Sequence, residues 1–480
     1  MDVGFIVDGA PADAEGGAIF ERKDPVTGKV ATRAAAATLA DVEKVVDSAA
    51  KAFPSWSETG PGARRALLLK AADLMESHTD DFIKLMLEET GATAPWAGFN
   101  VHLAASILRE AAALTTQITG EVIPSDKPGI LSMAIRQPVG VVLGIAPWNA
   151  PVILGTRAIA APLACGNTVI FRTSEACPAT HHLIGRILND AGFPKGVVNV
   201  ISNAPADAPK IIEALIAHPA VRRVNFTGST KVGKIIAKLA ADHLKPVLLE
   251  LGGKAPLIVL DDADLDQAVD AAAFGAFLNQ GQICMSTERF VVDEAVADAF
   301  VAKFAAKASK LPAGDPREHV VLGSLVDLAA AERMDVLIAD AVAKGAIVVA
   351  GGKRKGSIVD ATILDRVTPA MRIYKEESFG PVKSVVRVKG VEEAIRVAND
   401  TEYGLASAVF GRDIKRALAV AKRVETGICH INGPTVADEA QMPFGGVKAS
   451  GYGRFGGKAV INEFTDLRWI TIEGPQQYPF

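Results

Sequence analysis

The stretch VGVVLGIAPWNAP, residues 139–151, places an apolar run before a proline and a helix-compatible segment directly after it. Apolar runs without polar alternation are typical of strands that are covered on both faces of a sheet. Helical segments that begin near Pro151, Pro178, Ala206 and Ser229 separate this run from four similar ones. The alternation predicts an α/β fold with a parallel sheet of dinucleotide-binding, Rossmann type. The other runs are NTVIF (167–171), GVVNVI (196–201), RRVNF (222–226) and PVLLEL (246–251).

The rest of the chain predicts further units around this sheet. Helical periodicity covers 40–119, including one long helix that ends at Gly91 and should cover the sheet. A second α/β series follows from 255 to about 450, and the alternating segment 462–473 predicts an exposed strand. We therefore predict a dinucleotide-binding domain (1–116 and 139–252), a second α/β catalytic domain (253–447) and a small β oligomerisation element (117–138 and 460–480).

Composition excludes several classes of protein. The chain has 480 residues, too many for one ordinary core, and 49% of them are hydrophobic. A net charge of −4 without clustered Lys and Arg argues against nucleic acid and membrane partners. The N-terminal sequence has no targeting pattern, so we expect a cytoplasmic protein. Four widely spaced cysteines without a CxxC pair or a histidine cluster predict neither disulfides nor a metal site.

The segment FLNQGQICMSTERF, residues 277–290, places Cys284 in a loop rich in glycine and amides after an apolar helical stretch. A lone cysteine is usually a small core residue. The polar neighbours Gln280, Gly281 and Gln282 suit a backbone that is folded tightly against a ligand. This context favours a nucleophile over a packing residue.

Two other strings carry polar groups at the ends of apolar strands. Glu250 ends the strand in LLELGGKAP, and Asn149 follows the first strand in APWNAP. From the residues alone, Glu250 could instead bond neighbouring amides, and Asn149 could instead cap the next helix. A thiol, a carboxylate and an amide donor together provide the groups needed for covalent chemistry on a carbonyl.

These three strings together resemble the aldehyde dehydrogenase superfamily, and the resemblance covers essentially the whole chain. It is greatest to bacterial salicylaldehyde and vanillin dehydrogenases, through WAGFN (96–100), residues 277–290 and the tail HINGPTVADEAQMPFGGVKASGYGRF (430–455). The resemblance implies that Cys284 is the nucleophile, that Asn149 stabilises the oxyanion, and that Glu250 activates water against a thioester. It implies oxidation of an aromatic aldehyde to its acid, in a homodimer or a dimer of dimers.

The resemblance also implies NAD as the cofactor. Glu175 matches the acidic residue that holds the adenosine ribose, and a carboxylate there disfavours a 2′-phosphate. The superfamily commonly has lysine and proline where this chain has Arg172 and Thr173. The literal GxGxxG at 451–456 follows no predicted strand, so NFTGSTKVG (225–233) is the better phosphate site. The predicted cofactor residues are Trp148, Arg172, Glu175, Phe226, Gly228, Ser229, Val232, Gly233, Leu251, Glu377 and Phe379.

An aromatic substrate would need an apolar pocket beside the cysteine. Ala150 is small and could leave room for a ring, and Arg157 could face a phenolic oxygen or be an ordinary solvated helix residue. The predicted substrate residues are Trp96, Ala150, Arg157, Ile283, Met285 and Phe444.

Three alternatives stay open at this point. The first is a broad-specificity aliphatic or semialdehyde dehydrogenase of the same superfamily. The second is a cysteine hydrolase or acyltransferase, although none of the eight histidines lies in the catalytic strings. The third is a non-catalytic protein that retains the scaffold, which would bind cofactor without turnover.

Overall fold

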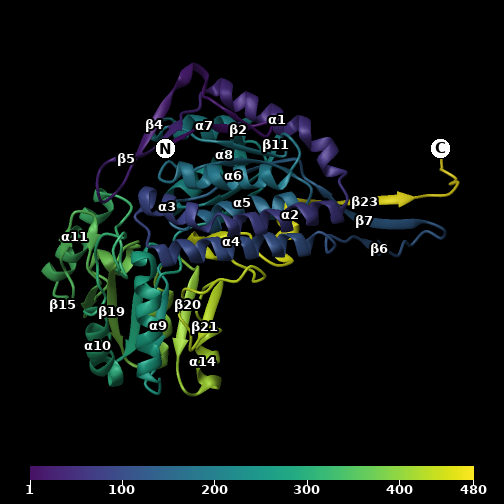
Figure 1. Ribbon diagram of the computed structural model, residues 1–480. Helices are drawn as coiled ribbons and strands as arrows, with labels where there is room; N and C mark the ends of the chain where they lie inside the picture. Colours follow the sequence, from purple (N-terminus) through teal and green to yellow (C-terminus); the bar gives the residue numbers. More distant parts are fainter.

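A computed structural model describes all 480 residues. Two α/β units, each built on a large sheet, lie side by side, and a narrow sheet projects away from them together with the C-terminus (Figure 1). No helix is both long enough and apolar enough to cross a lipid bilayer.

The first sheet has eight strands in the order β22-β12-β11-β8-β9-β10-β2-β3. Its five central strands are parallel and correspond to the five apolar runs of the sequence. Three short strands pair antiparallel at the two edges. The strands are β8 (Val141–Ile145), β9 (Thr168–Arg172), β10 (Val198–Ile201), β11 (Val221–Thr227), β12 (Val247–Glu250), β2 (Phe5–Val7), β3 (Ala10–Ala12) and β22 (Gly451–Tyr452).

Helices cover both faces of this sheet, which explains why its strands are continuously apolar. One face packs against α1, α7 and α8, and the other packs against α5 and α6, with α2, α3 and α4 as a further layer. The helices are α1 (Leu39–Ser57), α2 (Pro61–Ser77), α3 (Thr79–Thr90), α4 (Ala94–Leu114), α5 (Pro151–Ala164), α6 (Pro178–Ala191), α7 (Ala208–Ala217) and α8 (Thr230–Asp242).

The prediction of a single helix that ends at Gly91 is wrong, because the helix is interrupted at His78 and forms α2 and α3. His78 leaves helical geometry with φ −98° and ψ 21°. Its Nδ1 lies 2.7 Å from the Asp81 carboxylate, and acidic residues in the first turn stabilise the new helix start. Gly91 ends α3 in a left-handed conformation (φ 71°), as the sequence predicts for a helix C-terminus.

The second sheet has seven strands in the order β15-β18-β19-β14-β13-β20-β21, parallel except for β15. Helices α9 and α10 cover one face, and α11 to α14 lie over the other. The strands are β13 (Pro256–Val259), β14 (Arg289–Asp293), β15 (Ile347–Ala350), β18 (Thr362–Asp365), β19 (Val382–Val388), β20 (Ala406–Phe410) and β21 (Ile428–Ile431). The helices are α9 (Leu265–Phe277), α10 (Glu294–Ala308), α11 (Leu328–Ala343), α12 (Arg372–Lys375), α13 (Gly390–Asn399) and α14 (Ile414–Ala421).

The projecting sheet pairs the two segments that the sequence identified as extended, β6 and β7 with β23 (Figure 1). The expected strand over 462–473 begins later, because its first residues belong to the short helix α15. An additional sheet, β1-β5-β4, forms from the N-terminal residues and was not predicted. The bounds are β6 (Glu121–Ile123), β7 (Leu131–Pro138), α15 (Ala459–Phe464), β23 (Thr465–Ile472), β1 (Asp2–Val3), β4 (Ile19–Lys23) and β5 (Val30–Ala35).

Candidate active site

The candidate active site lies at the carboxyl ends of β8, β11 and β12. The strand order reverses at β8, because β9 and β10 follow on one side while β11 and β12 lie on the other. Such a reversal leaves a crevice where α/β proteins bind their ligands. A cavity of about 280 Å³ occupies this crevice. Its lining includes the predicted catalytic residues Asn149, Glu250 and Cys284 and the predicted cofactor residues Trp148, Gly228, Ser229, Leu251, Glu377 and Phe379.

The loop that carries Cys284 has an unusual backbone. After α9 ends, Asn279, Gln280 and Gly281 follow with φ of 48°, 57° and 72°. Non-glycine residues rarely adopt positive φ, and such conformations cluster at functional sites. A Cβ atom on Gly281 would lie 2.4 Å from the carbonyl oxygen of Gly380, so this close approach requires glycine.

The two glutamines of this loop hold it in place. Gln280 donates from Nε2 to the carbonyl oxygen of Ser324 (2.9 Å), and Gln282 accepts from the backbone N–H of Val326 (3.0 Å). Both side chains are buried. The amides that singled out this segment in the sequence therefore anchor the loop to the second unit.

Asn149 is fixed between the loop and the helices. Its Nδ2 donates to the carbonyl oxygen of Gln282 (3.0 Å), and its own carbonyl accepts from Trp96 Nε1 (3.1 Å) and Asn279 Nδ2 (3.0 Å). The helix α5 is capped by Ala150 without a side-chain bond, so Asn149 is not a helix cap. An amide nitrogen carries two hydrogens, which leaves one donor for a substrate oxygen.

Glu250 is a buried carboxylate with no hydrogen-bond partner. It ends β12, whose outer edge pairs with Gly451 and Tyr452 of β22, so the literal GxGxxG begins in a strand rather than a phosphate loop. The side chain is 3% exposed, and neither oxygen has a partner. Burial raises the pKa of Glu250 well above its ordinary value, although the guanidinium of Arg157 opposes this shift. A carboxyl group with a raised pKa can accept a proton near working pH.

Cys284 is partly exposed to the cavity, and its thiol is hard to ionise. The surrounding protein raises its pKa to about 12, first through burial and then through the nearby carboxyl groups of Glu250 and Glu377. The other cysteines are Cys165 and Cys177, which are buried, and Cys429, which is partly buried. Cys284 is therefore the thiol that faces the crevice.

Glu377 closes the crevice from the second unit. Its Oε1 accepts from the backbone N–H of Gly253 (2.8 Å). Burial raises its pKa to about 7, although the Gly253 N–H opposes the shift. Its neighbour Phe379 has a φ of 48° and meets the Trp148 ring edge-on, with centroids 5.7 Å apart. These three side chains line the cavity together.

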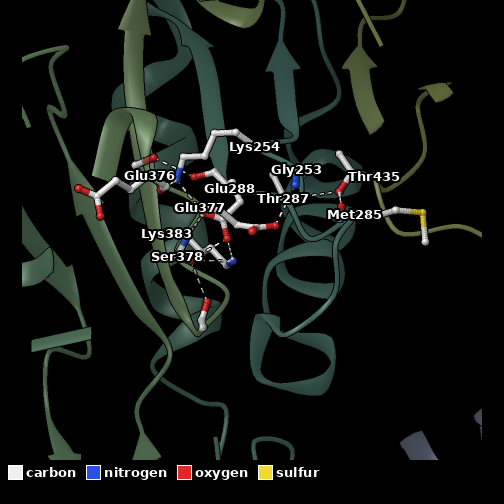
Figure 2. A network of polar contacts seen from close by, with 12 residues as sticks. Gly253, Lys254, Met285, Thr287, Glu288, Glu376, Glu377, Ser378, Lys383 and Thr435 are labelled. Carbon is white, nitrogen blue, oxygen red and sulfur yellow. Dashed lines mark hydrogen bonds and ion pairs between the residues drawn. The ribbon is translucent and has the colours of Figure 1, made fainter. Parts of the chain in front are cut away.

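A buried ion network supports the loop that carries Glu377 (Figure 2). The Glu288 carboxylate lies 2.7 Å from each of the ammonium groups of Lys254 and Lys383. It also accepts from the backbone N–H (2.8 Å) and the hydroxyl (2.6 Å) of Ser378. Burial would raise the pKa of Glu288, but the two lysines outweigh it and hold the pKa at about 2. This network could not be predicted from sequence, because its members lie on separate segments.

The predicted phosphate segment has the expected strand-to-helix geometry. β11 ends at Thr227, and Ser229 caps α8 by accepting from the backbone N–H of Val232 (3.4 Å). A Cβ atom on Gly233 would lie 2.4 Å from the Leu251 side chain, so glycine allows the helix to pack closely. The exposed N–H groups at such a helix start suit an anion. Phe226 and Gly233 are buried and support this turn.

Arg172 ends β9, Glu175 follows three residues later, and neither residue lines this cavity. Arg172 is bonded through two guanidinium nitrogens to the Glu175 carboxylate, and its Nε donates to Asn203 Oδ1 (2.8 Å). Glu175 is therefore a paired carboxylate rather than a free one. Asn203 was not predicted, and it joins this pair from the end of the neighbouring strand β10.

A second, mostly apolar cavity meets the first at Cys284, Asn149 and Leu154. Six predicted substrate residues, Trp96, Ala150, Arg157, Ile283, Met285 and Phe444, line it. Arg157 is buried rather than solvated, as its Nη2 lies 2.6 Å from Asp438 Oδ2 and its guanidinium lies 4.5 Å from the Phe444 ring centre. The lining residues that sequence reasoning missed include Phe99, Leu103, Phe274, Val436 and Asp438.

No group of three or more His, Cys, Asp or Glu side chains is placed to hold a metal ion. The site thus combines a thiol, an amide, a carboxylate, a strand-end crevice and an apolar cavity.

Residues 12–470 match the family model described as aldehyde dehydrogenase family. The chain belongs to this family. Aldehyde dehydrogenases are oxidoreductases that act on aldehydes, and this chain shares their mixed α/β fold with two parallel-sheet units.

Several aldehyde dehydrogenases are similar over their full length. A vanillin dehydrogenase from Pseudomonas fluorescens is 63% identical over 481 residues, covering 100% of both chains. A salicylaldehyde dehydrogenase from Pseudomonas putida is 55% identical over 483 residues, again covering 100% of both. The crystal structure of a salicylaldehyde dehydrogenase from Pseudomonas putida G7, complexed with salicylaldehyde, superposes with a TM-score of 0.98 at 55% identity and 100% coverage of both chains.

Proposed function

We propose that this aldehyde dehydrogenase oxidises aromatic aldehydes to carboxylic acids with NAD. The observation that carries the proposal is the position of Cys284 where the strand-end cavity meets an apolar cavity with aromatic walls. The first cavity suits a dinucleotide and the second suits a ring. Similar proteins are named for vanillin and salicylaldehyde, both of which carry an aromatic ring.

In this proposal the thiol of Cys284 releases its proton to solvent water and its sulfur attacks the aldehyde carbon, which gives a thiohemiacetal oxyanion. The Asn149 amide and the backbone N–H of Cys284 donate to that oxygen. When bound, NAD supplies the hydride acceptor, and oxidation leaves a thioester on Cys284. Glu250 then takes a proton from water, the hydroxyl adds to the thioester carbon, and the carbon–sulfur bond breaks to release the acid.

The residues of the first cavity fit a dinucleotide. Trp148, Leu251 and Phe379 provide apolar walls, and Glu377 provides an acceptor for a ribose hydroxyl. The start of α8 at Ser229 presents backbone N–H groups for a pyrophosphate. We assign the remaining predicted residues, Phe226, Val232 and Gly233, to the support of that turn.

We propose NAD rather than NADP because Glu175 repels a 2′-phosphate. The pairing with Arg172 reduces that repulsion, so we expect a preference for NAD that is modest rather than absolute. Comparing kcat/KM for the two cofactors tests this assignment. A larger value with NADP would reverse it, and Glu175→Ala should narrow the difference.

The first experiment follows the absorbance of reduced cofactor with NAD and salicylaldehyde, vanillin, benzaldehyde or a short aliphatic aldehyde. Preference for the aromatic substrates, lost in Cys284→Ala, supports the proposal. Equal or better aliphatic turnover would favour a broad-specificity enzyme. Hydrolysis of a thioester or ester substrate without any redox turnover would instead indicate a hydrolase or acyltransferase. Cofactor binding without any turnover would indicate a non-catalytic scaffold.

We also propose a homodimer or a dimer of dimers, with residues 117–138 and 460–480 at the subunit contact. The projecting sheet exposes large apolar side chains, including Leu467 (61%) and Trp469 (75%). Exposed apolar residues grouped on one sheet mark interaction surfaces. We assign residues 1–116 and 139–252 to the cofactor domain. We assign residues 253–447 to the catalytic domain.

A further inference from the structure

The Arg157–Asp438 pair leaves one carboxylate oxygen without a partner. Asp438 Oδ2 accepts from Arg157 Nη2 at 2.6 Å, whereas Oδ1 is buried and has no hydrogen bond. The Asp438 side chain is only 10% exposed. Buried polar atoms in proteins are normally paired, so an unpaired acceptor in a ligand cavity calls for a donor from the ligand.

The geometry places this oxygen on the substrate side of the site. Asp438 lines the same apolar cavity as Cys284. Its charge also acts on the pKa of both Cys284 and Glu250, which places the carboxylate close to the reacting groups. Among the side chains that line this cavity, Asp438 is the only one with a buried oxygen that lacks a hydrogen bond.

Trp96 and Asn149, which also line the cavity, already make hydrogen bonds to backbone carbonyls. Trp96 Nε1 donates to the Asn149 carbonyl (3.1 Å), and Asn149 Nδ2 donates to Gln282 (3.0 Å). Arg157 is held by Asp438 on one side and by the Phe444 ring on the other, with its guanidinium 4.5 Å from the ring centre. The fixed guanidinium of Arg157 orients the Asp438 carboxylate.

We infer that Asp438 accepts a hydrogen bond from a ring hydroxyl of the substrate and thereby selects hydroxylated benzaldehydes. This inference rests on the proposed function, since it takes the apolar cavity to hold the ring. A phenolic O–H donates to Oδ1, and an ether oxygen at the same position cannot. A site built to bond a hydroxyl discriminates strongly against analogues that lack it, because its buried acceptor is then left unpaired.

The test compares kcat/KM for 2-, 3- and 4-hydroxybenzaldehyde with benzaldehyde and with the corresponding methoxybenzaldehydes. We expect the wild-type enzyme to prefer at least one hydroxy isomer over both benzaldehyde and its methoxy counterpart. In Asp438→Ala and Asp438→Asn this ratio should fall about 10- to 100-fold, the range expected for a hydrogen bond to a charged group. The kcat/KM for benzaldehyde, which lacks the hydroxyl, measures in the same variants what loss of the Arg157 partner does to the reacting groups, so the ratio isolates the hydroxyl contact.

Glu439→Gln is the matched control, since it removes the neighbouring carboxylate, which does not line the cavity with Cys284. It should leave the ratio unchanged. The inference is overturned if the wild-type enzyme shows no preference for hydroxylated substrates. It is also overturned if the ratio is unchanged in both Asp438 variants, or if kcat/KM falls equally for all substrates. If Asp438→Ala does not fold, the ratio in Asp438→Asn decides. Absence of turnover with every aldehyde would instead contradict the proposed function itself.

Discussion

At the scale of single residues, Glu250 separates the two halves of the proposed reaction. We expect Glu250→Gln to produce one burst of reduced cofactor and then a steady rate lowered by about 10²- to 10⁴-fold, the usual contribution of a general base. Rapid-mixing absorbance measurements check both phases. A normal steady rate after the burst would show that another group activates water.

The raised pKa of Glu250 also gives the pH dependence a direction. A general base acts in its ionised form, so the ionised fraction, and with it the steady rate, should increase as the pH rises through that pKa. Where hydrolysis limits turnover, a rate that falls between pH 7 and pH 9 in the stable range of the protein would contradict this assignment.

The reactivity of the Cys284 thiol can be predicted separately for the enzyme without ligands. Its pKa of about 12 means that the thiolate fraction, which reacts with iodoacetamide, grows about tenfold per pH unit well above neutrality. Peptide mass spectrometry should show alkylation of Cys284 that still increases between pH 8 and pH 10. Cys165 and Cys177 are buried and serve as internal controls. A plateau near pH 8 would indicate an ordinary thiol.

At the scale of elements, the loop after α12 depends on charged side chains from separate segments of the chain. Removing one partner of a buried ion pair typically costs about 3–5 kcal/mol. We expect Glu288→Gln to lower the free energy of unfolding by that amount and to raise KM for NAD, because Ser378, next to Glu377, loses one of its two acceptor oxygens. Denaturant titration and cofactor kinetics measure the two effects.

Glu332→Gln is the matched control, because Glu332 is an exposed carboxylate on α11. It should change neither quantity. A Glu288→Gln protein with lower stability but an unaltered KM would show that the network supports the fold alone and does not position Glu377.

Elements set by interactions between residues close in the sequence could be predicted, and elements that depend on distant residues could not. The parallel strands and the helix starts near Pro151 and Pro178 were predicted correctly, because apolar runs and prolines act locally. The break at His78 was missed, since the periodic pattern continues through it.

The site divides in the same way. Cys284, Glu250 and Asn149 lie in recognisable strings, and the structure brings them to one cavity. Asp438 and Glu288 carry no local signal, because their partners are Arg157 on α5 and Lys383 on β19. Only the folded chain places such pairs together.

At the scale of the whole molecule, the projecting sheet predicts assembly. We expect a mass in solution that is a multiple of the 50.2 kDa subunit. Charged residues should oppose burial of the exposed apolar face, so Leu467→Asp with Trp469→Asp should lower the mass measured by light scattering.

Ile19→Asp is the control, because Ile19 is equally exposed (60%) but lies on the N-terminal sheet. A monomeric wild-type protein, or a double variant of unchanged mass, would contradict the assigned contact.

The edge pairing of β12 with Gly451 and Tyr452 has a consequence for the order in which the protein is made. A ribosome delivers the strand that ends in Glu250 about two hundred residues before the segment that completes its outer edge. Until then the strand has unpaired backbone groups, which favour association with other chains. The nascent enzyme therefore contains the Cys284 thiol long before the sheet edge next to Glu250 is complete. A fragment that ends before residue 451 would be a candidate for chaperone binding rather than for catalysis.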